Sequence, residues 1–172
     1  PPKAVTHMRD RHLWKLRAQV PAMRMRSGLR VGGSGQLPRA QNPEPRALWC
    51  SAKDVLHVDA LWKRWGLDGG RPVVVICPGA RSHIKRWSAD GFAHVADQLI
   101  MEAGAAIVFS GEPDEEPSVE EIRSGMRQRA HSAVGLTTIR QVGGLMQQAR
   151  LVITNDSASL HLASALDVPT VA

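Results

Sequence analysis

The sequence has few aromatic side chains and no tyrosine at all. Its 172 residues include five tryptophans and two phenylalanines, so aromatic residues make up only 4% of the chain. Proteins that hold single-stranded nucleic acids stack the bases on aromatic side chains set among basic ones, and that interleaving is weak here. No helix-turn-helix or RNA-recognition signature is present either. We therefore expect no nucleic acid partner, although the formal net charge is +6.

Cysteine and long apolar runs are scarce as well. Cys50 and Cys77 are the only cysteines, and their positions do not match the spacing of a metal site. Cys77 falls within an apolar run, which is typical of a buried thiol in a reducing compartment. No run reaches the roughly 18 apolar residues of a membrane span, and no apolar signal-peptide core follows the basic N-terminus. We expect a cytoplasmic protein without a metal site.

Positive charge is concentrated in the first part of the chain. Residues 1–71 carry a net charge of +9, whereas residues 72–172 carry −3. Residues 27–47 are rich in glycine, proline, serine and asparagine, a composition typical of a linker. The chain begins with Pro-Pro and no methionine, so we expect a fragment of a longer protein. The basic part is suited to an anionic substrate or an anionic lipid surface.

Apolar runs and helical stripes alternate from residue 72 onward. Continuous apolar runs predict strands that are buried on both faces, and stripes with a period near 3.6 predict helices. A Ser118-x-x-Glu121 capping box is expected to begin one of these helices. The predicted strands are 73–77, 106–109, 133–135, 151–154 and 168–172, and the predicted helices are 52–65, 92–103, one beginning near 118, 138–149 and 157–166. This order predicts an α/β fold with a parallel sheet and flanking helices, which stops on its last strand.

Unusual polar residues follow three of the predicted strands. They belong to the loops 78–87, 110–116 and 154–161, which contain the sequences PGARSHIKRW, SGEPDEE and TNDSASLH. Ligands of an open parallel sheet bind outside the carboxyl ends of its strands. The three loops are therefore expected to meet at one edge of the sheet and to form a binding site there.

The third loop leads directly into the helix predicted at 157–166. Ser157 is placed to cap this helix, whose first N–H groups and dipole would attract an anion such as phosphate. His161 lies four residues later and is expected on the same side. Lys85, with Arg81 beside it in the first loop, could add positive charge for a diphosphate. A plainer alternative is that the loop only caps a helix and that His161 and Lys85 are solvated surface residues.

Four motifs, taken together and in order, resemble glycosyltransferase family 9, the ADP-heptose:lipopolysaccharide heptosyltransferases. They are PGA…KRW…FA (78–93), FSGEPDEE (109–116), GLTTI (135–139) and NDSASLHLASALDVPTVA (155–172). The resemblance implies the glycosyltransferase B-type architecture, in which two Rossmann-like domains face each other across a cleft. Residues 1–50 would then be a remnant of the N-terminal domain and a linker. Residues 51–172 would be the nucleotide-sugar-binding domain, incomplete at its C-terminus.

The resemblance also implies roles for individual residues. Lys85 matches the family's phosphate-binding lysine, and Glu115 matches an acidic residue on the nucleotide-sugar side of the site, which contacts the ribose. Asp156, Ser157 and His161 match a loop around the diphosphate and sugar. Ala158 and Ser159 depart from the family pattern, which has glycine and often proline at these positions. Ala80 and Arg81 match it weakly, because some members have small hydroxyl residues there. The added methyl group of Ala158 is expected to weaken donor binding.

The implied reaction is transfer of a heptose-like sugar, with inversion, to a lipid-linked lipopolysaccharide core acceptor. ADP-heptose or another nucleoside-diphosphate sugar would be the donor, and no further cofactor is expected. Lys85, His161 and the helix N-terminus would stabilise charge on the leaving diphosphate. The base that activates the acceptor would come from outside this chain. We therefore expect the chain alone to bind nucleotide and to transfer little or no sugar.

The alternatives are a non-catalytic nucleotide-binding module and, less suited to the residues, a nucleotide-sugar epimerase. An enzyme of the implied kind would work in the cytoplasm, at the inner face of the membrane.

Overall fold

A computed structural model describes residues 50–82, 84 and 86–172 of the chain. The predicted linker at 27–47 lies outside the described residues, as does the proposed remnant of a preceding domain at 1–50 except for Cys50. Lys85 also lies outside them, so its predicted contact with phosphate stays a prediction. The account below concerns the described residues alone.

A five-stranded parallel sheet forms the centre of the fold, with strand order β3-β2-β1-β4-β5. Each pair of neighbouring strands runs parallel. The central strand is buried along all five of its residues, as its continuous apolar run predicts. The strands are β1 (Val73–Cys77), β2 (Ala106–Phe109), β3 (His131–Ser132), β4 (Leu151–Thr154) and β5 (Thr170–Val171). The predicted Rossmann-like α/β fold is confirmed.

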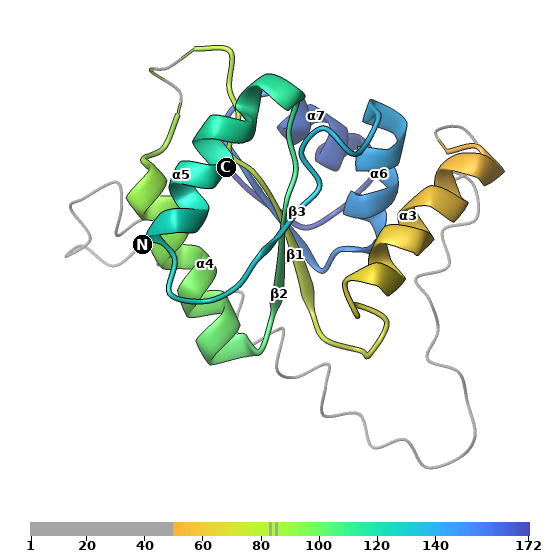
Figure 1. Ribbon diagram of the computed structural model, residues 1–172. Helices are drawn as coiled ribbons and strands as arrows, with labels where there is room; N and C mark the ends of the chain where they lie inside the picture. Colours follow the sequence, from red (N-terminus) through yellow and green to blue (C-terminus); the bar gives the residue numbers. More distant parts are fainter. Residues whose placement is uncertain (1–49, 83, 85) are drawn as a thin grey trace.

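Helices cover both faces of the sheet (Figure 1). The helices α4 (Ala89–Ala103) and α5 (Glu116–Gly125) pack on one face, where Phe92 and Phe109 are the largest side chains of the core. The other face is covered by α3 (Ala52–Arg64), α6 (Ile139–Gln148) and α7 (Ala158–Ala165). This second core includes Val58, Leu145 and Met146, which are fully buried. The sheet is therefore enclosed between two helical layers, which leaves its strand ends as the places where loops can form a site.

Local sequence explains most of the helix ends. Ser51 and Asp54 form a capping box at the start of α3, and Gly104 ends α4 in the left-handed conformation with a φ of 62°. The capping box predicted at Ser118 is wrong, because α5 already begins at Glu116. Pro117 lies in the first turn of α5, where its missing N–H costs no helical hydrogen bond. A short 3₁₀ turn, η2 (Pro113–Glu115), leads into this helix.

The edge strand β3 is joined to helix α3 by an aromatic contact. The imidazole of His131 stacks on the indole of Trp65, with ring centroids 5.4 Å apart and an interplanar angle of 23°. Burial, with additional repulsion from Arg71 and Arg123, lowers the pKa of His131. The folded protein therefore favours neutral His131 more strongly than the unfolded chain does.

Stability is accordingly expected to decrease as the pH falls below the ordinary histidine pKa of about 6.5. In this range the unfolded chain takes up a proton at residue 131 while the folded chain still resists it. Urea unfolding at pH 7.5 and pH 5.5 measures the effect. His131→Phe keeps an aromatic ring and cannot titrate, so it should show a smaller loss of stability between the two pH values. Equal losses in both proteins would rule out His131 as a source of the dependence.

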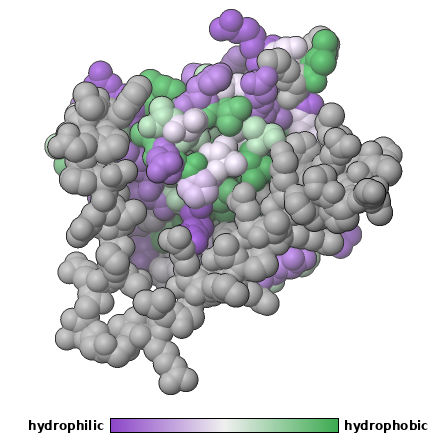
Figure 2. Space-filling model, turned by 180° about the vertical axis from the view of Figure 1, so that it is seen from behind, coloured by the Kyte–Doolittle hydropathy of each residue, from purple (hydrophilic) through white to green (hydrophobic). Residues whose placement is uncertain are grey.

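None of the helices described by the structure is both long enough and apolar enough to cross a membrane. Seen from behind, hydrophobic side chains gather in the middle of the visible coloured surface, with hydrophilic ones around them (Figure 2). The hydrophilic surface is thus interrupted by apolar groups on this face.

Candidate functional site

A cavity of about 490 Å³ opens at the carboxyl ends of the strands. Its walls come from the ends of β1, β2 and β4 and from the segment that joins β3 to α6. The lining residues are Cys77, Gly79, Ala80, Arg81, Ser82, Ser110, Gly111, Glu112, Glu115, Thr137, Ile139, Val142, Asp156, Ser157, Ala158 and Ser159. The predicted meeting of the three loops is therefore confirmed by the structure.

Five of the predicted site residues line this cavity together: Arg81, Glu115, Asp156, Ser157 and Ala158. His161 is exposed and is not among the lining residues. Its predicted position on the same side as Ser157 assumed that both belong to one helix, but Ser157 precedes α7 in an extended conformation. The contact of His161 with a ligand stays a prediction, as does that of Lys85.

The sequence reasoning missed a fourth wall of the cavity. Thr137 comes from the segment between β3 and α6, and Ile139 and Val142 come from the first turns of α6. The same rule about the carboxyl ends of parallel strands applies to β3, so this segment could have been included. Cys77, at the end of β1, was passed over because it lies in a buried apolar run. Ser110 was included only as the first residue of the loop 110–116 and was not singled out.

Asn155 holds two of the loops together beneath the cavity. Its side-chain amide donates a hydrogen bond to the carbonyl of Pro78 at 2.6 Å, and its side-chain carbonyl accepts one from the backbone N–H of Trp87 at 3.1 Å. Asn155 is only 6% exposed, so both bonds are shielded from water. Arg86 adds a bond from its Nε to the carbonyl of Ala80 at 2.9 Å. These contacts determine how the loop after β1 lies beside the loop after β4.

The carboxylate of Glu115 lies over two glycine turns. A methyl group added to Gly79 or to Gly111 would collide with this carboxylate, so the two glycines leave the space that it fills. The backbone N–H of Glu112 donates to Glu115 Oε2 at 2.9 Å. The 3₁₀ turn and the two glycines thus place one negative charge between the ends of β1 and β2.

The start of α7, which follows Asp156, forms another wall of the cavity. Ser157 is the N-cap residue, as predicted, but its side chain makes no capping hydrogen bond. The predicted side-chain cap is wrong because the Ser157 hydroxyl lies 3.3 Å from the hydroxyl of Thr154 instead. The first N–H groups of a helix have no partners within the helix, and the dipole adds positive charge there. This wall is suited to an anion, whereas the Glu115 wall is not.

Cys77 is a buried thiol at the floor of the cavity. Burial raises its pKa to about 12, although a hydrogen bond with Ser159 opposes this; the nearby charge of Glu115 raises it further. Cys77 is therefore protonated at neutral pH and is a poor nucleophile.

We expect one cysteine of the folded protein to react slowly, if at all, with iodoacetamide at pH 8. The unreactive residue is Cys77, whereas Cys50 is only partly buried. Mass spectrometry of the alkylated peptides, with and without urea, measures the two rates separately. The Cys77 peptide should be labelled at least ten times faster after unfolding. Fast labelling of Cys77 in the folded chain would contradict its burial and raised pKa.

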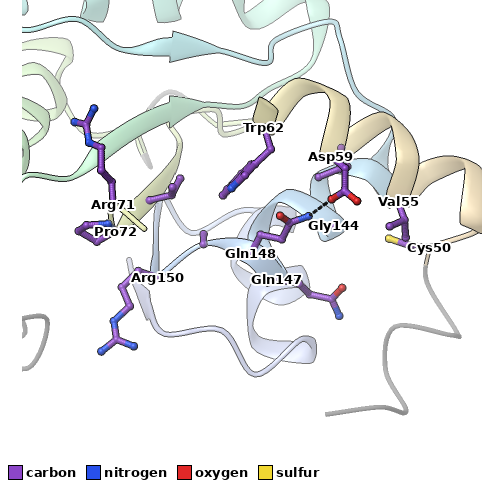
Figure 3. A pocket seen from close by; sticks show the side chains of 13 residues that line it. Cys50, Val55, Asp59, Trp62, Arg71, Pro72, Gly144, Gln147, Gln148 and Arg150 are labelled. Carbon is purple, nitrogen blue, oxygen red and sulfur yellow. Dashed lines mark hydrogen bonds between the residues drawn. The ribbon is translucent and has the colours of Figure 1, made fainter. Parts of the chain in front are cut away.

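A second cavity, of about 460 Å³, lies at the amino ends of the strands (Figure 3). It is bounded by α3 and α6, where Asp59 accepts a hydrogen bond from the side-chain amide of Gln148 at 3.1 Å. Pro72 and Arg150, which precede β1 and β4, form another part of its wall. None of the predicted site residues lines it. We assign the candidate site to the first cavity, because its residues come from the loops at the carboxyl ends.

The described residues contain no group of three or more histidine, cysteine, aspartate or glutamate side chains arranged to hold a metal ion. The polar groups of the first cavity are instead three acidic side chains (Glu112, Glu115 and Asp156), an arginine, several hydroxyls and a helix N-terminus. This set can bind a ligand that has an anionic part and a neutral part with hydroxyl groups.

Comparison with known proteins shows to which family the chain belongs. A sequence model of glycosyltransferase family 9 (heptosyltransferase) matches residues 40–172. The chain is 34% identical over 115 residues to lipooligosaccharide heptosyltransferase 2 of Haemophilus influenzae, covering 64% of this chain and 33% of that protein. It is 33% identical over 112 residues to lipopolysaccharide heptosyltransferase 2 of Salmonella typhimurium, covering 63% of this chain and 32% of that one.

Two solved structures share the fold. A family 9 glycosyltransferase from Veillonella parvula has a TM-score of 0.66 and 26% identity, covering 70% of this chain and 34% of its own. The ADP-heptose lps heptosyltransferase II of E. coli has a TM-score of 0.61 and 27% identity, covering 70% of this chain and 37% of its own. The chain thus spans about a third of the length of the relatives it matches. With the family match extending over most of its length, the chain belongs to glycosyltransferase family 9, the heptosyltransferases.

Proposed function

We propose that this chain is the donor-binding part of a heptosyltransferase, which transfers a heptose from a nucleoside-diphosphate sugar to a lipopolysaccharide core acceptor. The observation that carries the proposal is the polarity of the cavity. One wall is the N-terminus of α7, which follows Asp156, and another holds the carboxylate of Glu115; Arg81 supplies a positive charge to the same lining. A nucleotide sugar has a matching division into an anionic diphosphate and hydroxyl-bearing neutral groups.

The proposal places the diphosphate against the first turn of α7. Backbone N–H groups there, with Arg81 and Lys85 from the loop after β1, would hold the phosphate oxygens. Glu115 would accept hydrogen bonds from ribose hydroxyls, since a carboxylate is an acceptor and repels phosphate. ADP-heptose is the donor named for one structural relative, and we propose ADP as the nucleotide here.

The donor-binding chain would contribute to catalysis by electrostatic stabilisation of the leaving diphosphate. Negative charge develops on the diphosphate as the bond to the sugar breaks, and donors fixed in advance stabilise that charge without reorganisation. Lys85, His161 and the N–H groups of α7 are proposed for this role, without a further cofactor. The acceptor hydroxyl and the base that activates it are assigned to the rest of the enzyme, so the 172-residue chain alone should transfer little or no sugar.

We place the enzyme in the cytoplasm, in peripheral contact with the inner face of the membrane. The net charge of +9 over residues 1–71 supports attraction to anionic lipid, and a lipid-linked acceptor requires access to that surface. A flotation assay with vesicles containing anionic lipid would detect this contact.

Isothermal titration of the full chain with ADP, UDP and GDP tests the proposed function. ADP should bind most tightly, and Lys85→Ala should weaken its binding by about tenfold, the scale of one charge-assisted hydrogen bond. His161→Ala should weaken ADP binding as well if its imidazole reaches the diphosphate. Lys53→Ala is the matched control, because it removes an exposed lysine from α3 outside the cavity. The proposal fails if no nucleotide binds, or if neither Lys85→Ala nor His161→Ala has an effect.

A further inference from the structure

Ser110 presents a buried hydroxyl with no partner in the described part of the protein. The residue directly follows β2, and its backbone N–H donates to the carbonyl of Ile76 at 2.9 Å. It is 1% exposed, and its Oγ makes no hydrogen bond to any described group. Ser110 lines the cavity at the carboxyl ends of the strands.

Such a hydroxyl is unusual in a folded protein. The large majority of buried polar side-chain atoms have a hydrogen-bond partner, and leaving one without a partner is unfavourable. Valine or alanine would continue the apolar run of β2 without this cost. Because Ser110 borders the cavity, a group bound there is in a position to supply the missing partner.

The surroundings of Ser110 indicate which kind of group this is. The next residue is Gly111, and the carboxylate of Glu115 fills the space where a Gly111 side chain would be. A phosphate would be repelled by that carboxylate, whereas at the start of α7 the free N–H groups of the helix can offset the charge of Asp156. A neutral group that can both donate and accept hydrogen bonds is compatible with a hydroxyl and a carboxylate together.

We propose that the Ser110 hydroxyl is a specificity-determining contact to the nucleoside part of the donor. It forms a hydrogen bond with a neutral polar group of the ribose or base, on the same side as Glu115. This inference rests on the proposed function, since it deepens the description of the same nucleotide-binding cavity. It separates the cavity into a nucleoside end at β2 and a diphosphate end at α7.

Titration of the full chain with ADP, adenosine and inorganic diphosphate tests the assignment. Ser110→Ala should weaken binding of ADP and of adenosine by about five- to tenfold, the scale of one hydrogen bond. Binding of diphosphate should change less than twofold. Ser132→Ala is the matched control, because Ser132 accepts a hydrogen bond from the Val134 N–H and does not line the cavity. It should leave all three affinities unchanged.

Thermal unfolding separates this role from a structural one. Without ligand, Ser110→Ala should melt at the same temperature as the wild type or higher, because it removes a buried hydroxyl that lacks a partner. A lower melting temperature without ligand would overturn the inference. So would equal affinities of wild type and Ser110→Ala for ADP, or an equal loss for diphosphate. If the wild type binds neither ADP nor adenosine, the proposed function itself fails, and the role of Ser110 with it.

Discussion

Replacement of Asn155 by alanine is expected to destabilise the domain by about 2–4 kcal/mol, because one buried and one partly buried backbone group lose their hydrogen bonds to it. The carbonyl of Pro78 and the N–H of Trp87 are both satisfied by this one side chain. Since Asn155 also holds the loops after β1 and β4 together, ADP binding should weaken by tenfold or more. Urea unfolding measures the first effect and calorimetry the second.

The variant Asn155→Asp separates the two hydrogen bonds. An ionised aspartate can still accept from the Trp87 N–H, but it has no donor for the carbonyl of Pro78. A protonated aspartate regains that donor, so its pKa in the folded state should be raised. Its stabilising contribution is then fully present below the unfolded pKa of about 3.9 and is lost as the pH rises through the folded value. Relative to the wild type, Asn155→Asp should therefore be least stable near neutral pH and recover as the pH is lowered.

A control for loss of stability alone is Asp97→Ala. Asp97 is 8% exposed and accepts hydrogen bonds from the N–H groups of Arg127 and Gln128, each at 2.9 Å. It does not line the cavity. Its removal should destabilise the fold but leave ADP affinity unchanged at temperatures where the variant is folded. If both variants weaken ADP binding equally, Asn155 has no special influence on the site.

Phe92→Ala is expected to destabilise the protein by about 3–5 kcal/mol, the usual cost of deleting a fully buried phenyl group. Phe92 is 1% exposed in the core between α4 and the sheet. Its ring also meets the indole of Trp87 edge-on, with centroids 5.0 Å apart and an angle of 68°. The loss is a large fraction of the total stability of an ordinary domain, so the variant should be partly unfolded at 37 °C.

The matched control is Met101→Ala on the same helix. Met101 is 64% exposed, so its truncation should change the free energy of unfolding by less than about 0.5 kcal/mol. Circular dichroism during urea unfolding measures both variants, and near-ultraviolet signals report on the environment of Trp87. Equal stability of the two variants would contradict the assignment of Phe92 to the core.

The three long strands could be predicted from the sequence within one residue. Continuous apolar runs such as Val73–Cys77 can be buried only between two helical layers, and the structure encloses β1 in this way. The short strand β3 was predicted two residues too late. It has only two residues, each partly exposed, so hydrophobicity does not mark its position. The position of β3 is determined instead by its parallel pairing with β2.

The location of the candidate site could be predicted from the sequence, but the contacts of its individual residues could not. The rule that parallel strands share a carboxyl edge was sufficient to bring Arg81, Glu115 and Asp156 to one cavity. It could not indicate that Ser157 would bond with Thr154 instead of capping α7. It also could not show that His161 would lie outside the lining, because that depends on the residue at which the helix begins.

The amino-acid sequence by itself determined the alternation of buried strands and amphipathic helices, and hence the edge at which ligands bind. It could do so because burial depends on local patterns of apolar residues that are readable along the chain. Only the tertiary structure decided that Asn155 joins two loops and that the Ser110 Oγ has no hydrogen-bond partner among the described residues. Hydrogen bonding of a buried group depends on atoms far away in sequence, and their positions exist only once the sheet has formed.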